Sequence, residues 1–296
     1  MAPDASLPSS VPLTSEYREV NGVTLHVITA GPEDGPLVVL LHGFPDFWYG
    51  WREQIPALAD AGFRVLVPDQ RGYNLSDKPS GVRAYRISKL AGDVAALIRS
   101  EGRDSAHLVG HDWGGGVAWD CATRYPEMVD RLCILNAPHP RVFATALATN
   151  PRQLLRSWYI FYFFLPLLPE WTLGRNRQAT LELVLTDSSR PGIFHEGVMR
   201  YYHEAWSRDG ALRSMIHWYR AMPLAGPLPP KTRIRVPTLI CWGQDDGALR
   251  PELAAKSLEY CENGTLKRFE RASHWVHVEE PTGVNEALCA HLGVES

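Results

Sequence analysis

The residues around position 112 constrain the fold of this chain more than any other segment. Apolar residues 106–109 lead into Gly110-His111-Asp112-Trp113-Gly114-Gly115-Gly116, and apolar residues at helical spacing follow from Val117. Such an apolar run is typical of a buried strand, and the glycines permit the close backbone approach of a tight strand-to-helix turn. A turn of this kind holds one side chain above the sheet. Here that side chain is Asp112, where the commoner version of the turn has serine.

Apolar runs alternate with helical patterns through most of the chain. Residues 17–20 and 24–29 flank Asn21-Gly22, a two-residue hairpin signal that predicts an antiparallel pair of strands. Further strands are expected at 37–41, 64–69, 106–109, 129–136, 237–243 and 265–270, with helices at 51–62, 87–98, 117–122, 251–260 and 284–292. This alternation predicts an α/β fold with a mostly parallel central sheet and helices on both faces.

The alternation stops between residues 138 and 230. This segment has no buried strand run, and its helical stretches are separated by proline and glycine. One of them, residues 158–164, is strongly aromatic. We therefore expect a flexible tail at 1–15, an α/β core formed by 16–137 and 231–296, and an inserted helical cap domain at 138–230, which is a usual size for a small domain.

The composition excludes several classes of protein. The net charge of −3 and the lack of a basic block give no indication of a nucleic-acid partner, and no apolar run is long enough for a membrane span. The N-terminus lacks the apolar region of a signal peptide. Five cysteines without a CxxC pair favour free thiols in a reducing, cytoplasmic compartment, and no metal or cofactor is expected. The sequence leaves open whether the chain forms a homodimer.

A nucleophile on such a turn is followed along the chain by an acid and a histidine, each after a core strand. His274 follows the last expected strand. Asp246 follows the strand at 237–243 with Gly-x-x-Asp spacing, and its neighbour Asp245 is the alternative. His42 and His111 are expected to brace loops. The first turn of the helix after Asp112 should lower the pKa of this carboxyl, because free N–H groups stabilise the anion.

A carboxylate is nucleophilic at neutral pH without a base, which changes the task of the histidine. His274, oriented by Asp246, would activate a water molecule that hydrolyses an ester formed on Asp112. The oxyanion of that second step needs N–H donors. We expect them from the backbone of Trp113 and of Phe44, the latter in the loop His42-Gly43-Phe44-Pro45.

These motifs, together with Arg71-Gly72-Tyr73, resemble the α/β-hydrolase-fold epoxide hydrolases from about Tyr17 to the C-terminus. The resemblance implies conversion of an epoxide and water to a vicinal diol, in a role such as detoxification, and two cap tyrosines that hold the epoxide oxygen. Tyr219 matches one of them; Tyr159 matches the other, with Tyr162 as the alternative. Where the family often has a polar residue, this chain has Ile160, which indicates an apolar substrate. Trp113, Phe44 and Trp158 are expected to contact it.

Other activities of the same fold fit less well. A haloalkane dehalogenase uses the same aspartate and histidine, but it needs two N–H donors for the halide, and Phe44 provides no side-chain donor. A fluoroacetate dehalogenase would have arginine in place of Trp113, and a serine esterase would have serine in place of Asp112. A non-catalytic ligand receptor would tolerate a damaged triad, whereas every element is present here. The dehalogenase is therefore the main alternative.

Overall fold

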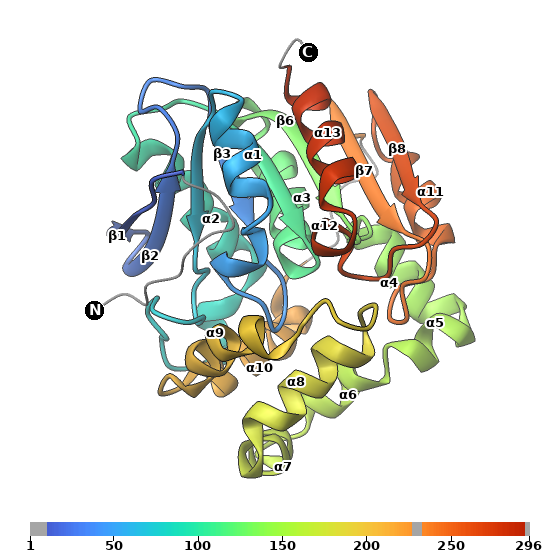
Figure 1. The fold of residues 1–296 in the computed structure, drawn as a ribbon. Coiled ribbons are helices and arrows are strands. Elements are labelled where there is room, and N and C mark those ends of the chain that lie inside the picture. The colour runs from blue at the N-terminus through green and yellow to red at the C-terminus, as the bar shows by residue number, and fades with distance from the viewer. Residues whose placement is uncertain (1–10, 227–232, 294–296) are drawn as a thin grey trace.

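The computed structural model describes residues 11–226 and 233–293, and its centre is an eight-stranded sheet (Figure 1). The order of the strands is β1-β2-β4-β3-β5-β6-β7-β8. β1 and β2 pair antiparallel, β2 pairs antiparallel with β4, and the remaining neighbours are parallel. The bounds are Thr14–Val20, Val23–Ala30, Leu37–Leu41, Arg64–Pro68, Ala106–His111, Val129–Leu135, Thr238–Gly243 and Gly264–Phe269 for β1 to β8.

The predicted strands agree with these bounds to within a few residues. The main difference is β1, which begins at Thr14 and not at Tyr17. Thr14 pairs with Thr29 and Ser15 with Ile28, so the expected flexible tail at 1–15 overlaps the first strand. Residues 1–10 of that tail lie outside the described part of the chain. Pairing with β2 explains the difference, because it orders a polar segment that has no apolar pattern of its own.

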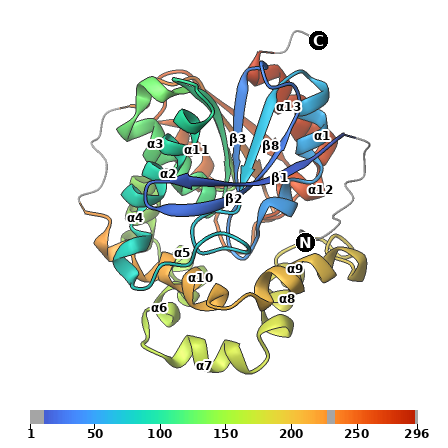
Figure 2. The same ribbon diagram turned by 90° about the vertical axis from the view of Figure 1, so that its left-hand side faces the viewer.

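Helices cover both faces of the sheet, as Figure 2 shows. One face carries α1 (Gln54–Asp60), α12 (Val276–Glu279) and α13 (Pro281–Leu292), and the other carries α2 (Ile87–Ser100), α3 (Trp113–Arg124) and α11 (Glu252–Leu258). Central strands are buried on both sides, which is why residues 37–41 and 106–111 are continuously buried. No helix in the described residues is long and apolar enough to cross a membrane.

A cap of helices lies at the carboxyl ends of the parallel strands (Figure 1). The regular elements described between residues 138 and 226 are all helical, as the sequence predicted. The expected end of the cap at residue 230 falls outside the described residues. The helices are α4 (Pro140–Thr149), α5 (Pro151–Arg156), α6 (Trp158–Phe164), α7 (Leu168–Arg175), α8 (Arg177–Asp187), α9 (Glu196–Ser207) and α10 (Ala211–Arg220), followed by η4 (Met222–Leu224).

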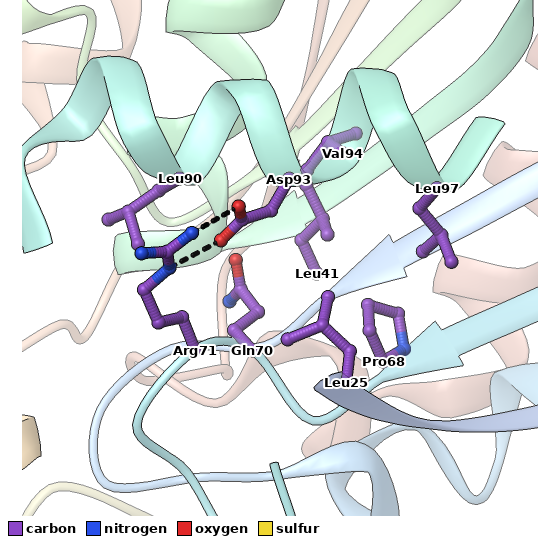
Figure 3. Close-up of a pocket in the computed structure, with 9 residues that line it drawn as sticks. All are labelled: Leu25, Leu41, Pro68, Gln70, Arg71, Leu90, Asp93, Val94 and Leu97. Carbon is purple, nitrogen blue, oxygen red and sulfur yellow. Dashed lines mark hydrogen bonds and ion pairs between the residues drawn. The ribbon is translucent and has the colours of Figure 1, made fainter. Parts of the chain in front are cut away.

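The loop after β4 makes contacts with both the core and the cap. Arg71 in this loop donates from Nε and one terminal nitrogen to the two carboxylate oxygens of Asp93 on α2, at 2.8 and 2.6 Å (Figure 3). Its backbone carbonyl accepts a hydrogen bond from the indole N–H of Trp218 on α10 at 2.9 Å. The next aromatic ring of the loop, Tyr73, packs edge-on against Trp218. The loop therefore fixes α10, which carries Tyr219, relative to the sheet.

Candidate active site

Asp112 sits at the turn between β5 and α3 in a backbone conformation that L-residues rarely adopt, with φ 48° and ψ −120°. The flanking glycines make this turn sterically feasible. A Cβ on Gly110 would lie 2.4 Å from the carbonyl oxygen of Gly114, and a Cβ on Gly114 would lie 2.0 Å from the carbonyl oxygen of Leu41. The structure therefore has the tight turn that the glycine pattern predicted.

Two backbone amides act on the Asp112 carboxylate. The Phe44 N–H donates to Oδ2 at 2.9 Å, and hydrogen bonding from the Trp113 N–H stabilises the same anion. Gly43 allows this approach, because a Cβ there would lie 2.5 Å from the Cβ of Asp112. The loop contains a cis peptide bond between Phe44 and Pro45. The geometry brings together the two amides that the sequence analysis named as oxyanion donors.

The expected lowering of the Asp112 pKa is wrong. Burial raises the pKa of this carboxyl above its ordinary value, and the opposing effects of His274 and the amides of Phe44 and Trp113 do not reverse the shift. The sequence argument considered the helix N-terminus alone. Desolvation depends on how closely the cap packs over the turn, and a single segment of sequence contains no information about that packing.

His274 lies between two carboxylates. Its Nδ1 is 2.8 Å from Asp246 Oδ2, and its Nε2 is 3.8 Å from Asp112 Oδ1. Burial alone would lower the pKa of His274, but the charges of Asp246 and Asp112 and the hydrogen bond to Asp246 raise it to about 9. Asp245, the alternative acid, is exposed. The arrangement therefore pairs His274 with Asp246.

Several donors hold Asp246 in place. Oδ2 accepts from the Asn136 amide at 2.8 Å, and Oδ1 accepts from the backbone N–H groups of Ala248 and Leu249, each at 2.8 Å. Burial acts to raise the pKa of Asp246, yet His274 and these hydrogen bonds bring it below its ordinary value. The sequence analysis did not identify Asn136 as a site residue. Asn136 directly follows β6, and β6 pairs with β7, the strand that leads to Asp246. This position could have identified Asn136 from the sequence.

Two cap tyrosines on different helices line the same cavity as Asp112. Tyr159 on α6 and Tyr219 on α10 have ring centroids 5.9 Å apart. Burial, with the negative charge of Asp112, raises the pKa of both phenols. Tyr162 instead forms a hydrogen bond with Thr172 of α7. Tyr159 is therefore the tyrosine of α6 that shares a cavity with Asp112.

That cavity has a volume of about 790 Å³. It is lined by Asp112, Trp113, Tyr159, Ile160 and Tyr219, together with residues of α2, α3, α4 and η4. A cavity of this size accommodates a drug-sized molecule. Its mainly apolar lining agrees with the expectation of an apolar ligand.

Two of the expected substrate contacts are not in the lining. The Trp158 side chain is 63% exposed on the outer surface of α6, because the helix turns its other face, with Tyr159 and Ile160, toward the cavity. Phe44 is buried and packs edge-on against Tyr219, with centroids 5.3 Å apart. Its backbone amide reaches Asp112, but its ring supports Tyr219. Trp113 lines the cavity as expected.

The two loop histidines have the bracing contacts that the sequence analysis expected. His42 Nε2 accepts from the backbone N–H of Gln70 at 3.0 Å, and His111 Nε2 donates to the carbonyl oxygen of His274 at 2.9 Å. Burial lowers the pKa of both rings, which keeps them neutral. They therefore fix the loops around the site and are not among the described residues that line the cavity.

Asp46, His111 and His277 form a buried group whose donor atoms lie within 4.8 Å of one another. The sequence analysis missed this group, because its members come from three distant segments. Nitrogen and carboxylate donors suit a transition metal. However, Asp46 Oδ2 and His277 Nε2 are 3.9 Å apart, whereas two ligands of one tetrahedral zinc ion lie about 3.3 Å apart at the usual bond lengths. The spacing of this pair does not fit a tetrahedral zinc ion without contraction of the group.

Comparison with known proteins identifies the family of this chain. The family model of the alpha/beta hydrolase fold matches residues 36–281. Epoxide hydrolase 1 of Caenorhabditis elegans is 40% identical over 93% of this chain and 69% of its own length. The chain belongs to the epoxide hydrolases of the α/β-hydrolase fold. In this family, the crystal structure of a Bacillus megaterium epoxide hydrolase with an inhibitor superimposes with a TM-score of 0.85 at 34% identity, covering 94% of this chain and 99% of that one.

A further relative of this epoxide hydrolase carries a less specific name. The AB hydrolase superfamily protein YfhM of Bacillus subtilis is 46% identical over 94% of this chain and 97% of its own length. The similarity over nearly the full length of both chains covers the core and the cap together.

Proposed function

We propose that this epoxide hydrolase converts an apolar epoxide and water to a vicinal diol through an ester on Asp112. The observation that carries the proposal is that Asp112, Tyr159 and Tyr219 line one cavity, while the His274 ring lies behind Asp112 with its Nε2 3.8 Å from the carboxylate. A carboxylate nucleophile with phenol donors opposite it suits a substrate that must be attacked at carbon while its oxygen is protonated.

In the first step Asp112 attacks an epoxide carbon and the carbon–oxygen bond breaks. The departing oxygen becomes an alkoxide and takes a proton from Tyr159 or Tyr219. The raised pKa of both phenols keeps them protonated at neutral pH, so they can act as general acids. The product is a hydroxyalkyl ester of Asp112 and a tyrosine phenolate.

In the second step water hydrolyses the ester. Alkylation removes the negative charge of Asp112, and this charge is one of the causes that hold the pKa of His274 at about 9. The pKa of His274 therefore falls in the intermediate, and the neutral imidazole can accept a proton from water. The amides of Phe44 and Trp113 stabilise the oxyanion on the former carboxyl group. The proton that His274 loses in the intermediate restores the phenol, and hydrolysis then yields the diol and the Asp112 carboxylate while His274 keeps the proton taken from water and returns to its charged resting state.

The alternative is dehalogenation of a haloalkane by the same nucleophile. The groups that face Asp112 across the cavity favour epoxide opening, because phenol hydroxyls donate a proton to an alkoxide, whereas a halide needs only hydrogen bonds. Phe44, where a side-chain donor for a halide is expected, has an apolar side chain that packs against Tyr219.

The test is diol formation from styrene-type, aliphatic and fatty-acid epoxides, with a haloalkane as control. A single turnover in oxygen-18 water separates the mechanisms. The ester route places the label in the Asp112 carboxylate in the first turnover, and direct attack of water places it in the diol. Halide release without diol formation would instead support the dehalogenase.

Three finer elements complete the proposal. A cytoplasmic location is supported by the five cysteines, which are all free thiols. A detoxifying role is supported by the volume and the mainly apolar lining of the cavity, which suit varied epoxides. A homodimer is supported by exposed apolar side chains on α5 to α8, among them Leu155, Phe161 and Leu183. Sedimentation velocity of the purified chain tests the homodimer, and a monomer at micromolar concentration would contradict it.

A further inference from the structure

Helix α9 of the cap contacts the loop that carries the Phe44 amide, although α9 contributes no residue to the described cavity lining. The helix lies on the side of the cap that faces the core (Figure 1). The indole N–H of Trp206 donates to the backbone carbonyl of Pro45 at 2.7 Å, and the Tyr202 hydroxyl donates to Asp46 Oδ1 at 2.8 Å. Trp206 and Tyr202 are four positions apart and lie on one face of the helix. They therefore hold the two residues that directly follow Phe44.

Both hydrogen bonds are shielded from solvent. The side chains of Trp206 and Tyr202 are buried, as are Pro45 and Asp46. A buried donor or acceptor that loses its partner is left unsatisfied, which is unfavourable. The Tyr202 ring also packs edge-on against Phe47, with centroids 5.1 Å apart. Movement of the loop relative to α9 would break these contacts, so the helix restricts that movement.

The loop transmits this restriction to the Phe44 amide. The backbone N–H of Asp46 donates to the carbonyl oxygen of Gly43 at 3.1 Å, which closes a turn over residues 43–46. Phe44 lies within this turn, and its N–H donates to Asp112 Oδ2 at 2.9 Å. Each residue of the turn has only two soft backbone dihedral angles. The direction of the Phe44 N–H therefore depends on where α9 holds the other end of the turn.

α9 is itself fixed within the cap. Nη1 of Arg177 on α8 donates to the backbone carbonyl of Trp206 at 2.9 Å, and Phe194 packs edge-on against Tyr202 with centroids 5.6 Å apart. Support from a rigid helix matters for an oxyanion donor, because such a donor is effective only when it is held about 2.7–3.1 Å from the position of the oxyanion. The contacts of α9 satisfy this requirement for preorganisation.

We propose that Trp206 and Tyr202 are positioning residues for hydrolysis of the ester on Asp112. Through these two residues α9 holds the turn at 43–46, so that the Phe44 N–H stays directed at the oxyanion of the second step. Neither side chain touches the reacting atoms. This inference rests on the proposed function, because the oxyanion belongs to the proposed second step.

The two steps of the reaction should respond differently to a displaced Phe44 amide. During alkylation the negative charge of Asp112 decreases, so a weaker hydrogen bond destabilises the starting carboxylate at least as much as the transition state. During hydrolysis a negative charge develops on the former carboxyl group, so the same weakening slows the step. A general loosening of the fold would not discriminate between the steps. The ratio of the two rate constants therefore reports on positioning.

The direct test measures both rate constants by rapid quench in single turnovers of a styrene-type epoxide. Trp206→Phe and Tyr202→Phe should each slow ester hydrolysis by about tenfold, a part of the about 10²–10³-fold effect of losing one oxyanion donor completely. Each should change the rate constant of alkylation by less than about twofold. Equal losses in both steps, or no loss in either variant, would overturn the proposal.

Tyr201→Phe is the matched control on the same helix. The Tyr201 hydroxyl accepts a hydrogen bond from Nη2 of Arg200 at 2.6 Å, so its removal should leave both rate constants unchanged. Melting temperatures identify a folding defect in any variant. If Trp206→Phe does not fold, Tyr202→Phe decides, because it keeps the aromatic ring and removes a single hydroxyl. A selective loss of hydrolysis in Tyr201→Phe as large as that in Tyr202→Phe would contradict the proposal.

An NMR measurement tests the positioning without turnover. Labelling with carbonyl-13C glycine and 15N phenylalanine selects two amides of this chain, in Gly43-Phe44 and Gly62-Phe63, and Phe63→Leu assigns them. In Tyr202→Phe the Phe44 signal should move upfield, as its hydrogen bond to Asp112 weakens, and the Phe63 signal should stay unchanged. Tyr201→Phe should shift neither.

The outcomes separate this inference from the proposed reaction. A wild type that forms no ester on Asp112 would contradict the proposed function, whereas a shifted Phe44 signal in Tyr202→Phe would still support the positioning by α9. An unchanged Phe44 signal in an enzyme that forms and hydrolyses the ester would leave the proposed function intact and refute the role of α9.

Discussion

His274 Nε2 lies 3.8 Å from Asp112 Oδ1, while the Nδ1 of the same ring is 2.8 Å from Asp246 Oδ2. The ring thus lies between two carboxylates with different roles. Asp112 loses its charge when it is alkylated in the first step, whereas Asp246 stays charged throughout the reaction. An ionised carboxylate is already a nucleophile, so Asp112 does not need direct hydrogen-bond contact with this ring. The arrangement fits a base that acts on water after the ester has formed.

Replacement of this base should trap the intermediate. His274→Ala leaves Asp112 and the tyrosines in place, so alkylation should proceed while ester hydrolysis slows by about 10²–10⁴-fold. Intact-protein mass spectrometry after one equivalent of epoxide should find the mass of the substrate added to the chain, on the peptide that contains Asp112. An unmodified chain, or full turnover, would contradict the role of His274.

The two tyrosines of α6 allow a matched comparison. Tyr159→Phe and Tyr219→Phe each remove a proton donor beside Asp112, and each should slow alkylation by about tenfold or more in rapid-quench measurements. Tyr162→Phe removes the same atom from the same helix but should slow alkylation less than about twofold, because Tyr162 bonds to Thr172 outside the cavity lining. Similar losses in Tyr162→Phe and Tyr159→Phe would contradict this assignment.

Asp245 and Asp246 are adjacent acids, and replacing each in turn tests the cause of the raised pKa of His274. Asp246→Asn removes the main charge that raises this pKa to about 9, so burial should then bring it below the value in the wild type. Asp245→Asn changes an exposed residue and should leave the pKa unchanged. The imidazole signals of His274 in an NMR titration measure both. An unchanged pKa in Asp246→Asn would refute the assigned cause.

The same raised pKa makes stability depend on pH. A histidine whose pKa is about 9 in the folded state and 6.5 when unfolded adds stability that is fully present below pH 6.5. This contribution disappears as the pH rises through about 9. Urea unfolding across that interval should show a decline in the free energy of unfolding that is smaller in Asp246→Asn. Equal declines in the two proteins would contradict the prediction.

Two glycines in the motif at residues 110–116 should respond in opposite ways to the same substitution. Gly114→Ala places a Cβ 2.0 Å from the carbonyl oxygen of Leu41 and should destabilise the fold by several kcal/mol or prevent folding. Gly116→Ala places a Cβ in open space inside α3 and should stabilise the helix by about 0.5–1 kcal/mol. Urea denaturation measures both, and a destabilised Gly116→Ala would contradict the steric argument.

Sequence reasoning failed where the outcome depended on distant packing. The glycine and aspartate pattern at residues 110–116 predicted the turn, but it could not predict that burial raises the pKa of Asp112. Trp158 and Tyr159 are adjacent in an aromatic run, yet one is largely exposed and the other lines the cavity. Asn136, Asp46 and His277 acquire their partners only when separate loops meet.

The sequence by itself determined the α/β core, the helical nature of the cap, and the order of nucleophile, acid and histidine. These features follow from local patterns: continuous apolar runs form strands buried on both faces, and glycines permit a turn with a short approach between backbones. The tertiary structure decided which tyrosine of α6 shares the cavity with Asp112 and which acid orients His274. Those outcomes depend on burial and on contacts between distant segments, which local patterns do not encode.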